Sequence, residues 1–171
     1  MKAVRVIERI TDATAVIGVV MIVPLIGSMV YEVVSRYVFR APTAWAYETS
    51  YMLMAAVFVF GIAYTLKVRQ HVSVDIIDEF IGRKGRAVID LLGYCLLFPC
   101  VAWISWKLCG NAVHAFQTGE VTGESSWNPV VWPHRSAIAA GFVIFTLQIV
   151  AEVIRALSYL LAAPSPAEAM E

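Results

Sequence analysis

The chain has 171 residues, of which 60% are hydrophobic and only 15% are charged. A soluble domain of this length needs a larger polar share because its surface faces water. The 13 basic and 13 acidic residues balance to a net charge of zero, which excludes the strongly basic surface of a nucleic-acid-binding protein. We therefore expect an all-α integral membrane protein with a single membrane domain over residues 1–171.

The first expected span covers residues 13–37 and begins with 19 residues that carry no charge. A helix needs about 20 apolar residues to cross the hydrocarbon core of a membrane, and a proline such as Pro24 is tolerated there. The charged residues before this span are not followed by a convincing cleavage site, so we expect the span to be retained rather than removed as a signal peptide.

The second expected span covers residues 47–66 and follows a short turn that contains a proline and aromatic residues. The stretch after it, residues 67–86, is the most charged part of the chain. Its apolar residues recur at helical spacing opposite acidic residues. This pattern predicts a short amphipathic helix at the membrane surface over about residues 74–82, between spans two and three.

The third and fourth expected spans cover residues 87–116 and 136–161. The loop between them, residues 117–135, is rich in glycine, proline and tryptophan, and its tryptophans suit the interface between lipid and water. Residues 163–171 have the composition of a disordered tail. The sequence thus predicts a bundle of four transmembrane helices.

Basic residues predict how this bundle is oriented. If the N-terminus lies in the cytoplasm, nine of the 13 lysines and arginines fall on the cytoplasmic side and four on the outer side. Because basic residues are enriched in cytoplasmic segments, we expect both termini to be cytoplasmic.

Ionisable residues near the span ends are expected to be structural. The spacing predicts local ion pairs between Glu32 and Arg36 and, at the ends of other spans, two further pairs, Arg40 with Glu48 and Glu152 with Arg155. The middle of every span lacks charge, whereas a carrier that works alone usually places a carboxylate near mid-membrane.

Cofactor chemistry has little support in the sequence. The cysteines Cys95, Cys100 and Cys109 match no zinc or redox spacing. A haem held between helices needs two facing histidines, and of the three histidines only His114 and His134 are expected on the same side of the membrane. We therefore expect no enzyme activity, cofactor or metal site. An accessory scaffold is favoured, and a stand-alone small exporter or an unrelated four-helix scaffold remain as alternatives.

Two runs, RYVFRAPTAWAYE and FGIAYTLKVRQHVSVDII, resemble the small membrane subunit of tripartite ATP-independent periplasmic (TRAP) transporters, the DctQ-like small permease family. The resemblance covers about residues 10–160. The residues that carry it, or that adjoin it as candidate interface positions, are Arg36, Phe39, Arg40, Pro42, Trp45, Glu48, Gly61, Ala63, His71, Asp75, Pro129 and Trp132.

The resemblance implies a scaffold role in the bacterial inner membrane, in contact with its lipids. The partners would be a large permease, with which the chain forms a heterodimer, and a periplasmic substrate-binding protein. The complex would use sodium to take up an organic acid.

The resemblance also implies roles for individual residues. Arg36, Arg40 and Glu48 would fix the hairpin between spans one and two or meet a partner, and Gly61 with Ala63 would permit close helix approach. At the start of the surface helix, residues 71 and 75 would cap it or bond to each other. A lipid-facing glycine and an exposed histidine are the alternatives.

Overall fold

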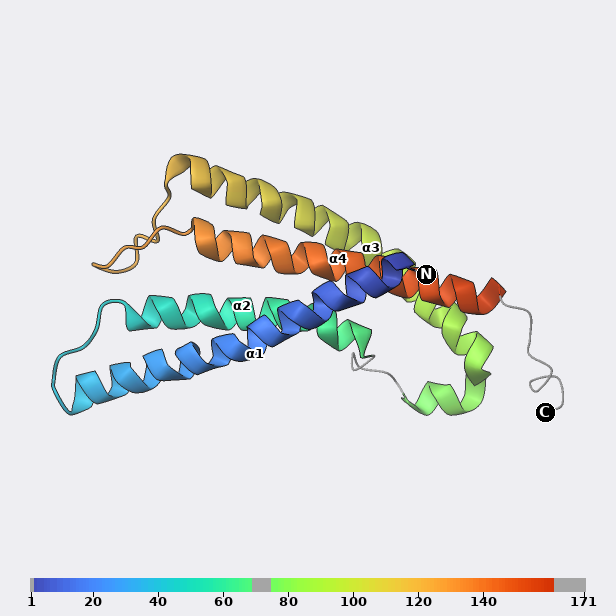
Figure 1. Ribbon diagram of the computed structural model, residues 1–171, viewed down its shortest axis with the longest axis horizontal. Helices are drawn as coiled ribbons and strands as arrows, with labels where there is room; N and C mark the ends of the chain where they lie inside the picture. Colours follow the sequence, from blue (N-terminus) through green and yellow to red (C-terminus); the bar gives the residue numbers. More distant parts are fainter. Residues whose placement is uncertain (1, 69–74, 162–171) are drawn as a thin grey trace.

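Four long helices make up the part of the chain that the structure describes (Figure 1). A computed structural model describes residues 2–68 and 75–161, with side chains placed at residues 4–68, 85 and 88–161. The helices are α1 (Lys2–Tyr37), α2 (Ala46–Lys67), α3 (Asp75–Thr118) and α4 (Trp132–Leu161). Each contains a stretch long and apolar enough to cross a membrane, which confirms the predicted all-α chain with four spans. The predicted tail over residues 163–171 lies outside the described residues.

The helices extend further than the predicted spans. α1 begins at Lys2, well before residue 13, because the residues ahead of the span include several good helix formers and no glycine or proline, so the helix continues beyond its apolar part. α4 begins at Trp132, and Pro133 occupies its first turn, where the missing proline N–H costs no hydrogen bond. The loop between α3 and α4 is accordingly shorter than predicted.

α3 is longer than a membrane span requires. Its 44 residues extend about 66 Å at 1.5 Å per residue, about twice the thickness of the hydrocarbon core. The apolar part is Val88–Thr118. The predicted surface helix is not a separate element, since residues 75–82 form the beginning of α3. Figure 1 shows this beginning turned away from the direction of the rest of α3, and its position at a membrane surface stays a prediction.

The helices form an open array in the order α1, α2, α4, α3. α4 packs against α2 and α3, and α1 packs against α2 and also crosses α4, whereas in the described part of the chain α3 contacts α4 alone. The connections 38–45 and 119–131 lie at one end, which we call the hairpin end (Figure 1). The opposite end, with the start of α1 and the end of α4, is the terminal end. Because α1 and α3 lie at the margins, their most apolar windows are only 11% buried within the chain.

The buried core lies where α2 and α3 meet α4. It consists of Ala63 and Leu66 from α2, Val101 from α3, and Phe145 and Ile149 from α4. Each of these side chains is at most 5% exposed. Ala63 therefore has the packing role that the sequence predicts for it.

Close helix approach occurs at Gly141 and not at Gly61. A Cβ atom at Gly141 would lie 2.1 Å from Val59 Cγ1 and 3.1 Å from the Val59 carbonyl oxygen, so only glycine fits where α4 meets α2. A Cβ atom at Gly61 would meet nothing within 4 Å. Among the described residues no neighbouring helix comes close at Gly61, so its role in close helix approach, which would then be towards a partner, stays a prediction.

Short hydrogen bonds between hydroxyl groups join neighbouring helices. Ser28 on α1 and Ser50 on α2 lie 3.0 Å apart, and Ser105 on α3 and Thr146 on α4 lie 2.8 Å apart. Small hydroxyl side chains commonly bind helices together in this way in lipid, where packing rather than the hydrophobic effect holds the spans.

Candidate functional site

The turn between α1 and α2 is fastened to the last turns of α1 at the hairpin end. Arg36 Nε donates to Glu32 Oε1 over 2.8 Å, which confirms the predicted ion pair. The second carboxylate oxygen of Glu32 accepts from the Thr43 N–H over 2.9 Å. Ser35 adds a further clasp, since its hydroxyl donates to the Ala41 carbonyl and its own carbonyl accepts from the Ala41 N–H. Glu32 is therefore a structural clamp of the turn.

Arg40 stands at the apex of this turn in an unusual backbone conformation. Its φ angle is +53°, a left-handed value that costs a residue with a Cβ atom about 1 kcal/mol or more. The side chain is exposed and forms no ion pair with any described residue. The predicted pair between Arg40 and Glu48 is therefore wrong, because the turn directs Arg40 outward while Glu48 lies under another loop.

Glu48 joins α2 to the loop between α3 and α4. It lies in the first turn of α2, where the helix dipole favours a negative charge, and it is 0% exposed. Its Oε2 accepts a hydrogen bond from Thr122 Oγ1 over 3.1 Å, and its Oε1 is buried without a hydrogen-bond partner in the described residues. A buried carboxylate is costly to leave unpaired, so this contact defines how the loop sits on α2.

The loop 119–131 is a small, ordered hairpin. Val121 and Val130 pair as an isolated bridge, and the Thr122 N–H donates to the Pro129 carbonyl over 3.1 Å. Asn128, with a φ angle of +45°, accepts the Gly123 N–H on its side-chain oxygen over 2.6 Å. Arg135 at the start of α4 donates two hydrogen bonds to the Glu120 carboxylate, from Nη1 to Oε2 over 2.7 Å and from Nη2 to Oε1 over 2.5 Å. Pro129, a predicted site residue, thus contributes through its backbone.

Aromatic residues surround the hairpin end. The ring of Trp45 lies 5.6 Å from that of Tyr31, and the ring of Trp132 meets that of Phe116 edge-on at 5.5 Å. Phe39 is 71% exposed at the turn, and Pro42 is also exposed. Amphipathic rings at this level are typical of the boundary between lipid and water.

The remaining predicted site residues do not join this cluster. Gly61 lies in the second half of α2, and Asp75 is the first residue of α3, so both are far along the molecule from the turn (Figure 1). The side chain of Asp75 and the whole of His71 are outside the described part of the chain, so their proposed bond stays a prediction. The two sequence motifs therefore occupy opposite ends of α2.

A buried polar network ties α1 to α4 near the terminal end. Thr11 Oγ1 donates to Gln148 Oε1 over 3.0 Å, and Gln148 Nε2 donates to Glu152 Oε1 over 3.0 Å. Arg155 Nη1 donates to Glu152 Oε1 over 2.9 Å and also pairs with Glu8. The local pair of Glu152 with Arg155 is confirmed, but it is part of a larger network that joins two helices.

Sequence reasoning missed three members of this network and Thr122 of the loop. Gln148 is an isolated amide in the uncharged part of α4, four residues before Glu152, and that spacing was a usable signal. No sequence signal pointed to Thr11, Glu8 or Thr122, because their partners are distant in the sequence.

Loss of the Glu48 carboxylate is expected to loosen the loop 119–131. In Glu48→Ala the Thr122 hydroxyl loses its acceptor, which is worth about 1 kcal/mol, so the amides of Thr122 and Val131 should exchange hydrogen about fivefold faster. Exchange measured by mass spectrometry on loop peptides tests this. Glu124→Ala, which removes an exposed carboxylate of the same loop, is the control. Equal exchange in both variants and the wild type would contradict the role of Glu48.

The sequence of the chain is similar to those of known transporter proteins. The sequence profile of the DctQ component of tripartite ATP-independent periplasmic transporters matches residues 25–158. The chain is also 25% identical over 85 residues to the sialic acid TRAP transporter permease protein SiaT of Haemophilus influenzae (strain 86-028NP). That match covers 50% of this chain and 14% of the relative, so the chain corresponds to a small part of the relative's length. The profile match includes the turn, α2, the loop and nearly all of α4.

Proposed function

Because the chain belongs to the family of DctQ components of TRAP transporters, we propose that it is the small permease subunit of a sodium-driven transporter that takes up an organic acid. In this role it stands beside a large permease that holds the substrate and sodium sites. A periplasmic binding protein delivers the substrate. The similarity to a permease named for sialic acid, which is itself an organic acid, supports this class of cargo.

The way the chain uses its ionisable residues supports a scaffold role. Glu32 fastens a turn, Glu48 holds a loop, and Glu152 with Arg155 joins two helices. A carboxylate that binds a transported ion must be able to exchange partners, whereas these carboxylates have structural hydrogen bonds within the chain. The observation that carries the proposal is that Glu32, Glu48 and Glu152 each hold parts of the fold together.

The open array leaves apolar surface for a partner. Within the described ranges α3 packs against α4 alone, and it exposes large apolar side chains, among them Leu92, Leu96, Trp103, Trp106 and Phe116. Such a surface is satisfied equally by lipid and by the helices of a large permease. The proposal assigns part of it to the permease.

The hairpin end is proposed to face the periplasm, with both termini in the cytoplasm of a bacterial inner membrane. The excess of basic residues in the segments at the terminal end supports this orientation. Arg40 then presents its exposed guanidinium to the outside. An arginine held at a left-handed position, which glycine would occupy with less strain, is suited to a carboxylate on a partner protein.

Co-expression with a large permease tests the proposal. An affinity-tagged copy of this chain is expected to retain the large permease through detergent purification in a fixed ratio. Arg40→Gly, which suits the positive φ angle and removes the guanidinium, should leave that complex intact but lower binding-protein-dependent uptake about tenfold. Arg40→Lys, which keeps a positive charge and the same positive φ angle, serves as the matched control. Purification of the chain without any permease, from membranes that contain both, would count against the proposal.

A further inference from the structure

An apolar groove of about 580 Å³ runs between α1 and α2. It lies within the stretches that are apolar enough to cross a membrane, so its walls are in contact with lipid. Its lining includes Asp12, Val16 and Val20 from α1 and Val57, Gly61 and Tyr64 from α2. All of its lining residues come from these two helices, although α4 packs against both of them elsewhere.

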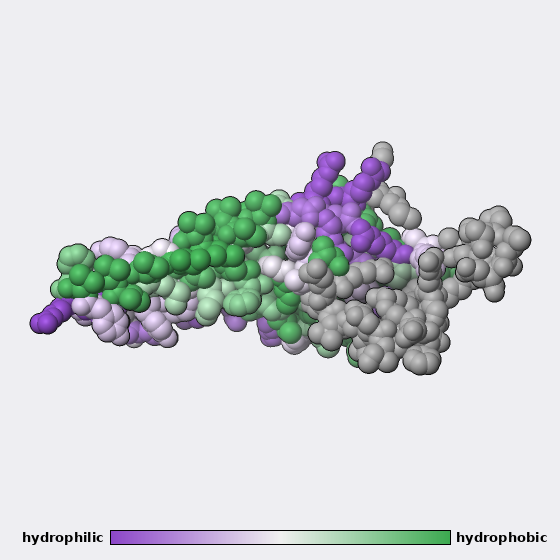
Figure 2. Space-filling view, turned by 90° about the horizontal axis from the view of Figure 1, so that it is seen from below, coloured by the Kyte–Doolittle hydropathy of each residue, from purple (hydrophilic) through white to green (hydrophobic). Residues whose placement is uncertain are grey.

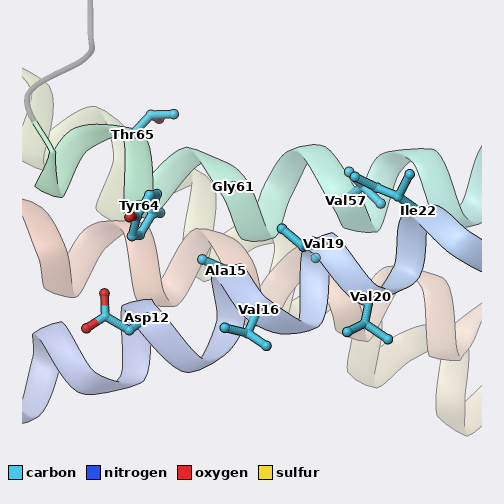
Figure 3. A pocket seen from close by; sticks show the side chains of 11 residues that line it. Asp12, Ala15, Val16, Val19, Val20, Ile22, Val57, Gly61, Tyr64 and Thr65 are labelled. Atoms are coloured by element: carbon cyan, nitrogen blue, oxygen red, sulfur yellow. The ribbon is translucent and has the colours of Figure 1, made fainter.

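The groove has one polar end. Figure 3 shows Asp12 and Tyr64 together at the end nearer the start of α1, and Val20, Ile22 and Val57 towards the other end. Asp12 also pairs with Lys67, the last residue of α2. The polarity therefore changes along the groove as it does along an amphiphile, with a polar head at the terminal end and a hydrocarbon tail beyond it.

Two arginines continue the same face of α1 past the polar end. Arg5 and Arg9 precede Asp12 and Val16 at helical spacing, so the four residues lie within about 40° of one line on the helix. Both arginines are exposed, and neither forms an ion pair with the residues that the structure describes. Figure 2 shows hydrophilic side chains gathered beside the hydrophobic surface in this part of the molecule. Arg5 and Arg9 thus place positive charge beyond the polar end of the groove.

The lining of the groove fits a hydrocarbon chain. The groove has a volume of about 580 Å³, its walls are almost entirely apolar, and its polar side chains stand at one end, as a headgroup stands at one end of an acyl chain. We propose that this groove binds an acyl chain of an anionic phospholipid whose phosphate group is held by Arg5 and Arg9.

Gly61 acquires a role under this proposal. A Cβ atom at this position would meet nothing within 4 Å, so a larger side chain would project into the groove that Gly61 lines. Glycine there keeps the groove open without serving any contact inside the fold. The guanidinium groups of Arg5 and Arg9 supply bidentate hydrogen bonds to a phosphate, which is the geometry that arginine matches best.

Phospholipid binding to the purified full chain tests the proposal. The chain is stripped of lipid in a neutral detergent, phosphatidylglycerol is titrated in, and bound lipid is counted by native mass spectrometry. Gly61→Phe fills the groove, and Gly27→Phe is its matched control, because Gly27 is on α1, outside the groove lining, with open space around it. Arg5→Gln with Arg9→Gln removes the phosphate contacts, and Lys107→Gln is the charge control. Helicity by circular dichroism verifies that each variant is folded.

The expected result is one tightly bound phosphatidylglycerol on the wild type. Its affinity should fall about tenfold in Gly61→Phe and about tenfold in the double arginine variant, and it should be unchanged in both controls. Equal binding by Gly61→Phe and the wild type, or an equal loss in the two phenylalanine variants, would overturn the proposal. So would a Gly61→Phe variant that binds phosphatidylglycerol normally but no longer retains the large permease, since the groove would then hold a protein side chain.

Discussion

Substitution of Arg155 by methionine is expected to unfasten α1 from α4 and to lower the free energy of unfolding by about 3 kcal/mol. Arg155 pairs with Glu8 and with Glu152, and Glu152 is 1% exposed. Removal of the guanidinium takes a positive charge away from two carboxylates in a site that water reaches poorly. The loss of a charge partner for a buried carboxylate costs more than the modest net value of the ion pair itself.

The Arg155→Met effect is measured from unfolding in a mixed detergent titration, followed by circular dichroism. Arg36→Met is the matched control, because the Arg36 side chain is 54% exposed and its pair with Glu32 contributes at most about 1 kcal/mol. Adding Glu8→Gln to Arg155→Met removes the negative charge of one of the two carboxylates that Arg155 contacts, and it should recover part of the free energy of unfolding. Similar unfolding midpoints for Arg155→Met and Arg36→Met would contradict a buried network.

Gly141→Leu is expected to force α2 and α4 apart. The first added carbon would already lie 2.1 Å from Val59 Cγ1 and 3.1 Å from the Val59 carbonyl oxygen. The Val59 side chain could move away, but the Val59 backbone, which is part of α2, could not. Overpacking of this kind costs about 1–3 kcal/mol for small additions, and leucine adds three more carbons. The helical core around Phe145 should therefore loosen, with a lower thermal midpoint in detergent.

A double substitution tests whether the loss of stability at Gly141 comes from packing against Val59. Gly141→Ala with Val59→Ala removes the methyl group that the new Cβ atom would strike, so the pair should be more stable than Gly141→Ala alone. Gly110→Ala is the control, because its Cβ atom would meet nothing within 4 Å. Equal losses for Gly141→Ala and Gly110→Ala would show that α2 and α4 are not in close contact there.

The spans and two of the three predicted ion pairs were predictable because each depends on residues that are near in sequence. An uncharged run of about 20 residues must cross the membrane, and spacing alone places Glu32 beside Arg36. The residue at which α1 begins was not predictable, because helical hydrogen bonding continues past the edge of the apolar run.

Contacts between helices were not predictable from the same patterns. The bond from Thr122 to Glu48 joins residues 74 positions apart, and that from Thr11 to Gln148 joins residues 137 apart. Such pairs depend on how the helices rotate and cross. The same limit explains the two glycines, since Gly61 and Gly141 both lie in apolar runs and only the packed structure tells which one faces a neighbour.

Reconstituted uptake tests most directly whether this chain supports a transporter made of three proteins. Proteoliposomes are prepared with this chain, with a large permease, or with both, and the cognate binding protein is added outside with a radiolabelled organic acid that it has been shown to bind. The prediction is sodium-dependent uptake only when both membrane chains and the binding protein are present. Sodium-dependent uptake by this chain alone, or full uptake by the large permease without it, would contradict the proposed role.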